Sequence, residues 1–137
     1  MEIKLNSKIL EEMQQVNPSN MAPPGGHYSH ASIASGLVFV SGQLPITASG
    51  KLLNEASFEE QVNQTLLNVK TVLEAAGSSV AQLVQVRVFI TSIGNWPAFN
   101  QIYKEWAGQS FPARAVVPVP ELHYGFSIEV EAVGLVS

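Results

Sequence analysis

Two charged residues near the C-terminal end of the chain, Arg114 and Glu129, could together bind an anion and move a proton. A guanidinium forms paired, charge-assisted hydrogen bonds with a carboxylate, and a glutamate can accept a proton from water as a general base. Arg114 lies in the apolar run 113–117, where its charge is costly unless it reaches water, a carboxylate or a ligand. Taken alone, Arg114 is also explained by a structural ion pair, and Glu129 by simple hydration.

The segment 111–132 that holds both residues predicts two strands joined by a proline-containing connection, 119–125. Its second strand alternates, with one face formed by Phe126, Ile128, Val130 and Ala132 and the other by Ser127, Glu129 and Glu131. The pattern therefore predicts a half-buried strand with an acidic face. We expect the connection to bring Arg114 and Glu129 together.

The rest of the chain predicts a hairpin over 27–45, a helix from Ser57 to a stop at Gly77, a strand over 84–91 and a second helix from about 96–97. We expect that second helix to bury Trp96, Phe99, Tyr103 and Trp106. Residues 1–15 form either a short helix capped at Ser7 or an irregular N-terminal arm. The element order is β-β-α-β-α-β-β, which indicates one α+β domain over 1–137 with a single sheet and helices on one face.

Composition limits the classes of function. The chain has 137 residues, no cysteine and a net charge of −4, which excludes disulfides and thiolate chemistry and gives nucleic-acid binding no support. It contains no apolar run of membrane-spanning length and no leader pattern, so we expect a soluble, cytoplasmic protein with no membrane partner. Only 13% of the residues are charged and 46% are hydrophobic, which favours burial of further apolar surface in a homo-oligomer.

Three short motifs resemble the RidA/YjgF family of 2-iminobutanoate/2-iminopropanoate deaminases. They are Pro112-Ala113-Arg114 followed by Ile128-Glu129-Val130-Glu131-Ala132, Tyr28-Ser29 followed by Ala31, and Ser41-Gly42-Gln43-Leu44-Pro45. The resemblance extends over most of the chain. It implies a chorismate-mutase-like fold, assembled as a homotrimer with the sheets forming an inner barrel and the helices outside.

The resemblance also implies a reaction, hydrolysis of 2-imino acids or their enamine tautomers to 2-oxo acids and ammonia, without a metal or organic cofactor. Arg114 would bind the substrate carboxylate, and Glu129 would activate water and return the proton to the departing nitrogen. Tyr28 would line the pocket, and backbone groups near Gly42 and Val116 would orient the substrate. Asn100 corresponds to an asparagine near the family's subunit interface, although a solvated helix residue explains it equally well.

The chain departs from the family at several positions near the expected pocket. Val116 stands where the deaminases often have cysteine, and His27 and His30 stand where proline and glutamine are common. The connection 121–125 is more aromatic than in typical members, so a larger enamine such as 2-aminomuconate is an alternative substrate. His27 and His30, without cysteine or a nearby carboxylate, fall short of a metal-ligand set.

Two other functions stay open on the sequence. The first is a non-catalytic trimer that binds a small ligand or a protein and acts like a holdase, because a fold does not determine a function. The second is an endoribonuclease. A binding protein could retain Arg114 and dispense with Glu129, a deaminase needs both, and a ribonuclease should show salt-dependent affinity for RNA.

Overall fold

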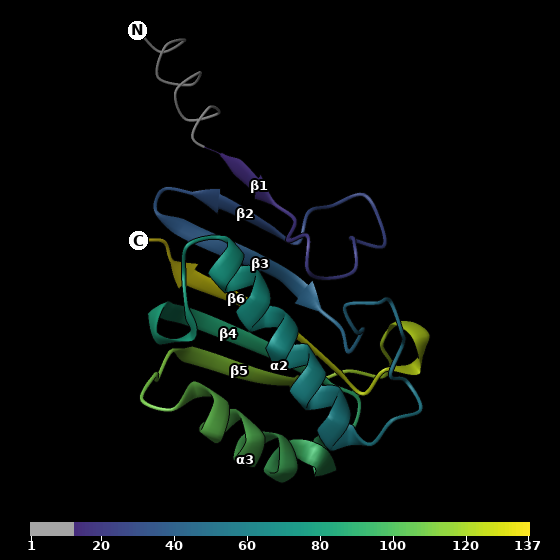
Figure 1. Cartoon of the computed structure of the whole chain (residues 1–137). Coiled ribbons are helices and arrows are strands. Elements are labelled where there is room, and N and C mark those ends of the chain that lie inside the picture. The colour runs from purple at the N-terminus through teal and green to yellow at the C-terminus, as the bar shows by residue number, and fades with distance from the viewer. Residues whose placement is uncertain (1–12) are drawn as a thin grey trace, which may run out of the picture.

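The computed structural model describes residues 13–137, and the short helix considered for 7–13 falls almost entirely outside them (Figure 1). Two long helices and six strands form the framework. In chain order they are β1 (Gln14–Val16), β2 (Ala31–Ala34), β3 (Leu37–Gln43), α2 (Phe58–Ala75), β4 (Leu83–Ile90), α3 (Trp96–Ala107), β5 (Ala113–Pro118) and β6 (Ile128–Leu135). None of the described helices is long and apolar enough to cross a membrane.

All six strands belong to one sheet with the order β1-β2-β3-β6-β4-β5. The β4–β5 pair is parallel, and every other neighbouring pair is antiparallel. Both helices lie on the same face of the sheet, with α2 across its middle and α3 beside its β5 edge (Figure 1). The predicted element order, the single sheet and the one-sided helices are therefore confirmed, with β1 as an additional short strand.

The core lies between α2 and the sheet. The predicted stripe of α2, formed by Val62, Leu66, Val69, Leu73 and Ala76, is buried. Ser57 begins the helix because its side chain accepts a hydrogen bond from the Glu60 backbone N–H at 3.1 Å. Gly77, with φ of 83°, ends the helix in a conformation that other residues rarely adopt.

Two details of the sequence prediction are wrong. Trp96 is 39% exposed rather than buried, because it occupies the first turn of α3, whereas Phe99 and Tyr103 one and two turns further on face the core. The strands of 111–132 are also not neighbours, because β4 lies between β5 and β6. Chain proximity therefore does not make Arg114 and Glu129 neighbours in the sheet.

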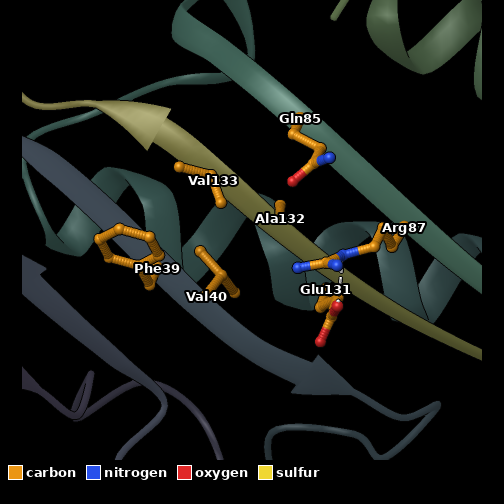
Figure 2. Close-up of a pocket in the computed structure, with 7 residues that line it drawn as sticks. All are labelled: Phe39, Val40, Gln85, Arg87, Glu131, Ala132 and Val133. Atoms are coloured by element: carbon orange, nitrogen blue, oxygen red, sulfur yellow. Dashed lines mark ion pairs between the residues drawn. The ribbon is translucent and has the colours of Figure 1, made fainter. Parts of the chain in front are cut away.

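The face of the sheet without helices is partly apolar. Figure 2 shows Phe39 from β3 and Val133 from β6 on this face, close to an ion pair between Arg87 and Glu131. The Arg87 Nε lies 2.7 Å from the Glu131 Oε1, and no other ion pair occurs in the part of the chain that the structure describes. Phe39 is 45% exposed. Such a surface, with aromatic and aliphatic side chains among polar ones, suits contact with another protein chain.

Candidate functional site

Glu129 lies against the backbone of Gly42. The pairing of β3 with β6 shifts register between Val40 and Gln43, which produces an irregularity at Gly42. A Cβ atom added at Gly42 would lie 2.5 Å from the Glu129 Oε2. Only glycine leaves room for the carboxylate in this position, so the irregularity in β3 and the absence of a side chain together seat the Glu129 carboxylate.

This carboxylate borders a cavity of about 550 Å³. The cavity brings together three of the residues selected from the sequence, which are Tyr28, Gly42 and Glu129. Its remaining walls come from the loop before β2, from β3 and the segment after it, and from β6 and the turn before it, through Gly25, Gly26, Ser41, Leu44, Ile46, His123, Tyr124 and Glu131. Two acidic groups, Glu129 and Glu131, thus border a concave surface with both apolar and hydrogen-bonding walls, an arrangement typical of small-molecule sites.

Burial raises the pKa of Glu129 above its ordinary value, because the partly apolar surroundings disfavour the charged carboxylate. The nearby His123 opposes this shift and lowers the pKa, whereas the negative charge of Glu131 raises it further. A carboxylate with a raised pKa is a stronger base once ionised, so Glu129 has the properties of a general base.

Arg114 lies in a second cavity, of about 490 Å³, between β5 and α3. Its Nη1 donates a hydrogen bond to the Asn100 Oδ1 at 3.0 Å, and its guanidinium carbon lies 4.8 Å from the centre of the Tyr103 ring. Burial raises the pKa of the Tyr103 hydroxyl, and the Arg114 charge lowers it. Within residues 13–137, Arg114 has no carboxylate partner. The guanidinium is therefore oriented by α3 and still able to bind an anion.

The structure does not bring Arg114 and Glu129 together within one chain, contrary to the expectation from the sequence. Arg114 pairs with Val86 across β4–β5, and Val86 is fully buried beneath the helices. Glu129 pairs with Phe89 across β4–β6. Phe89 lies three residues after Val86 in β4, and because successive side chains of a strand alternate, it faces the opposite side of the sheet. The two side chains thus point to opposite faces of the sheet, with β4 between their strands.

The remaining selected residues divide between the two faces. Asn100 is the hydrogen-bond partner of Arg114, and Val116 packs against the core on the same face. Tyr28 and Gly42 lie with Glu129. Sequence reasoning placed the aromatic connection 121–125 near the expected pocket but did not select His123 and Tyr124, which the structure places on the cavity wall.

His30 has a structural position. Its ring is buried, with Nε2 2.8 Å from the Ala22 carbonyl oxygen and Nδ1 3.2 Å from the Gln43 amide nitrogen. Because a carbonyl oxygen only accepts, Nε2 donates here and Nδ1 accepts from Gln43. No group of three His, Cys, Asp or Glu side chains suited to hold a metal ion occurs among residues 13–137.

Comparisons with known proteins agree with the fold. The family model described as "Endoribonuclease L-PSP" matches residues 19–136. The chain is 39% identical to protein HMF1 of Saccharomyces cerevisiae over 77% of this chain and 81% of that protein. It is 34% identical to the 2-iminobutanoate/2-iminopropanoate deaminase of Homo sapiens over 85% and 87% of the two chains. The crystal structure of Escherichia coli TdcF with bound serine is similar, with a TM-score of 0.84, 29% identity, and coverage of 90% of this chain and 99% of that one.

Proposed function

Because this chain belongs to the RidA/YjgF family, to which the endoribonuclease L-PSP model corresponds, we propose that it hydrolyses reactive 2-imino acids and their enamine tautomers to 2-oxo acids and ammonia. The observation that carries the proposal is the carboxylate of Glu129, seated against Gly42 at the wall of a cavity. Relatives named as 2-iminobutanoate/2-iminopropanoate deaminases support the same reaction class.

Glu129 acts as the general base. With the imine nitrogen protonated, Glu129 takes a proton from a water molecule while the water oxygen bonds to the imine carbon and the C=N electron pair moves to nitrogen and neutralises it. The resulting tetrahedral intermediate carries hydroxyl and amino groups on one carbon. Glu129 returns its proton to the nitrogen, the C–N bond breaks, and its electron pair leaves with ammonia. The hydroxyl proton passes to the ammonia as the 2-oxo acid forms, so the products are the 2-oxo acid and an ammonium ion, and atoms and charge balance without a cofactor.

Arg114 binds the substrate carboxylate from a neighbouring copy of the chain. The two residues lie on opposite faces of one sheet, so one substrate can reach both only where two chains meet. The partly apolar helix-free face supports assembly through the sheets, and β5 with Arg114 lies at the sheet edge. We therefore propose a homotrimer in which each site takes Glu129, Tyr28 and Gly42 from one chain and Arg114 from the next. Backbone groups near Val116 would orient the substrate beside Arg114.

Asn100 and Tyr103 position the guanidinium for this role. The hydrogen bond to the Asn100 Oδ1 uses one Arg114 N–H and fixes the plane of the group, while the Tyr103 ring supports it. Further N–H groups of Arg114 stay available for the two oxygens of a carboxylate. Lysine would not reproduce this planar arrangement.

The test is a coupled assay in which 2-aminoacrylate or 2-iminobutanoate is generated in situ and release of the 2-oxo acid is followed. We expect the wild-type protein to accelerate the release. Arg114→Ala and Glu129→Gln should each lower the rate by a factor on the order of 100 to 10,000. Trp96→Ala, on an exposed part of α3, is the control for substitution itself.

Failure of the folded wild-type protein to accelerate hydrolysis of any imino acid tested would refute the deaminase. Full activity of Glu129→Gln would refute the role given to the carboxylate. Salt-dependent RNA cleavage by wild type would favour the endoribonuclease. The structure argues against this function, because the carboxylates of Glu129 and Glu131 at one cavity repel phosphate.

A further inference from the structure

Two exposed tyrosines stand on the walls of the Glu129 cavity. Tyr28 comes from the loop before β2 and is 52% exposed, and Tyr124 comes from the turn before β6 and is 60% exposed. They reach the same cavity from segments almost 100 residues apart in the chain. Exposed aromatic rings that converge on one cavity differ from scattered surface aromatics, because together they offer a ligand two flat apolar surfaces.

Each tyrosine ring is already oriented by an aromatic neighbour. The Tyr28 ring meets His30 edge-on, at 6.5 Å between ring centres and an angle of 87°. The buried hydrogen bonds of His30 hold that imidazole in place. The Tyr124 ring meets the buried Phe126 in the same manner, at 5.7 Å and 75°. Both walls are therefore preorganised, and a ligand that packs on them loses little of its binding free energy to ordering side chains.

The backbone of Tyr124 is strained. Its φ is 59° and its ψ 15°, in the left-handed region that a bulky side chain rarely adopts. Ser35, in the tight β2–β3 turn, is the other non-glycine residue with positive φ among those the structure describes. Glycine or asparagine would satisfy the backbone at position 124 at lower cost. This strain, at the wall of a cavity that holds a general base, indicates that the ring itself has a function.

Building on the deaminase function proposed above, we propose that Tyr28 and Tyr124 bind the substrate side chain and that the preferred substrates are 2-imino acids with aromatic side chains. The imine carbon lies at Glu129, and the side chain extends between the tyrosines toward Leu44 and Ile46. In the trimer proposed above, a second copy would occupy part of the 550 Å³, so the inference depends on the chemistry of these walls more than on the volume. A short alkyl side chain would leave both rings largely uncovered.

The experiment compares two imines, generated in situ by an amino acid oxidase from alanine and from phenylalanine, and follows release of the 2-oxo acid. We expect the wild-type kcat/KM to be about tenfold higher for the aromatic imine. In Tyr124→Gly, which removes the ring and relieves the backbone, that ratio should fall about tenfold, mainly through KM. Tyr124→Asn, which also accepts positive φ, gives a second test if the glycine variant folds poorly. Trp96→Ala, an exposed aromatic outside the cavity, should leave the ratio unchanged.

The two proposals fail in different ways. If the wild-type protein hydrolyses the alanine-derived imine as well as the aromatic one, the aromatic preference is overturned and the deaminase stands. If wild type prefers the aromatic imine but the ratio is the same in both Tyr124 variants, the binding role of Tyr124 is overturned and the deaminase stands. If wild type accelerates neither imine, the deaminase itself fails, and the substrate preference fails with it.

Discussion

At the scale of single residues, the contact between Gly42 and Glu129 links the backbone to the chemistry. An added Cβ at Gly42 would lie 2.5 Å from the Oε2 and 2.9 Å from the Cδ of Glu129. Both atoms belong to the end of a flexible side chain, so the glutamate can move away without a change in the backbone. A substitution here should consequently affect the position of the base more than the stability of the fold.

We therefore expect Gly42→Ala to lower kcat about 100-fold, because a displacement of roughly 1 Å in a reacting group can have that effect. The free energy of unfolding, measured with urea, should change by about 1 kcal/mol or less. Gly94→Ala is the matched control, because its Cβ would meet only the Ser92 Oγ at 3.6 Å. An active Gly42→Ala protein would show that the carboxylate need not lie against residue 42.

The raised pKa of Glu129 gives a prediction about pH. Since the base must be ionised, kcat/KM should fall on the acid side at a pH above the ordinary glutamate pKa. His123→Gln removes a group that lowers the Glu129 pKa, so it should move the midpoint of this fall to higher pH. A pH profile of kcat/KM for both proteins checks this. An unchanged or lower midpoint in the variant would mean that His123 does not act on the Glu129 pKa.

The raised pKa of Glu129 also makes the free energy of unfolding depend on pH. A carboxyl whose pKa is higher in the folded than in the unfolded state binds more protons when folded, so its contribution to stability is lost as pH rises through the raised pKa. Glu129→Gln has no such titration. The difference in unfolding free energy should therefore favour the variant more at neutral than at acid pH.

At the scale of elements, α2 does more than cover the sheet. Asn68 on its buried face donates hydrogen bonds to the carbonyl oxygens of Leu44 and Ile46, at 3.0 and 2.9 Å. These two residues form the wall of the Glu129 cavity after β3. One buried amide of the helix thus holds an irregular segment whose own pairing is limited to an isolated bridge between Ile46 and Leu52.

Asn68→Ala would leave both carbonyl oxygens without this donor, and we expect a loss of roughly 1–3 kcal/mol in the free energy of unfolding. Asn63→Ala, on the exposed face of the same helix, should change it by no more than about 0.5 kcal/mol. Urea unfolding of the two variants measures the difference. Equal stability would indicate that water replaces the Asn68 amide at the cavity wall.

The elements also show what could be predicted from the sequence. The predicted apolar stripe and N-cap of α2 were correct, because a helix stripe and a helix cap each depend on residues that are close together in the sequence. The alternation of 126–132 correctly placed Ile128 and Val130 inside and Glu129 on the other face. The order of the strands was not available, since periodicity distinguishes the two faces of a strand but not its neighbours, and β4 separates β5 from β6. The segment 121–125 was placed near the pocket by resemblance, but Tyr124 itself was not selected, because a turn has no periodicity that would tell which of its side chains faces the cavity.

At the scale of the whole molecule, the sheet separates Arg114, the proposed anion-binding group, from Glu129, the proposed base. Arg114 lies beside α3 and Glu129 on the helix-free face, so the proposed activity belongs to an assembly rather than to one chain. A site that is shared between chains can be rebuilt from two defective chains, whereas a site within one chain cannot. Two inactive variants that lack different halves of the site should restore one another when their chains mix.

We expect Arg114→Ala and Glu129→Gln proteins, unfolded together in equal amounts and refolded, to recover activity. A site is intact only when its Arg114 comes from the Glu129→Gln chain and its Glu129 from the Arg114→Ala chain, so random assembly gives about one quarter of the wild-type sites. The control is each variant refolded alone, which should stay inactive, and sedimentation should show the same trimer in all samples. Every trimer that contains both variants has one interface at which an intact Arg114 meets an intact Glu129 of the next chain. If the mixed trimers are nevertheless as inactive as their parents, Arg114 and Glu129 do not form a site between chains.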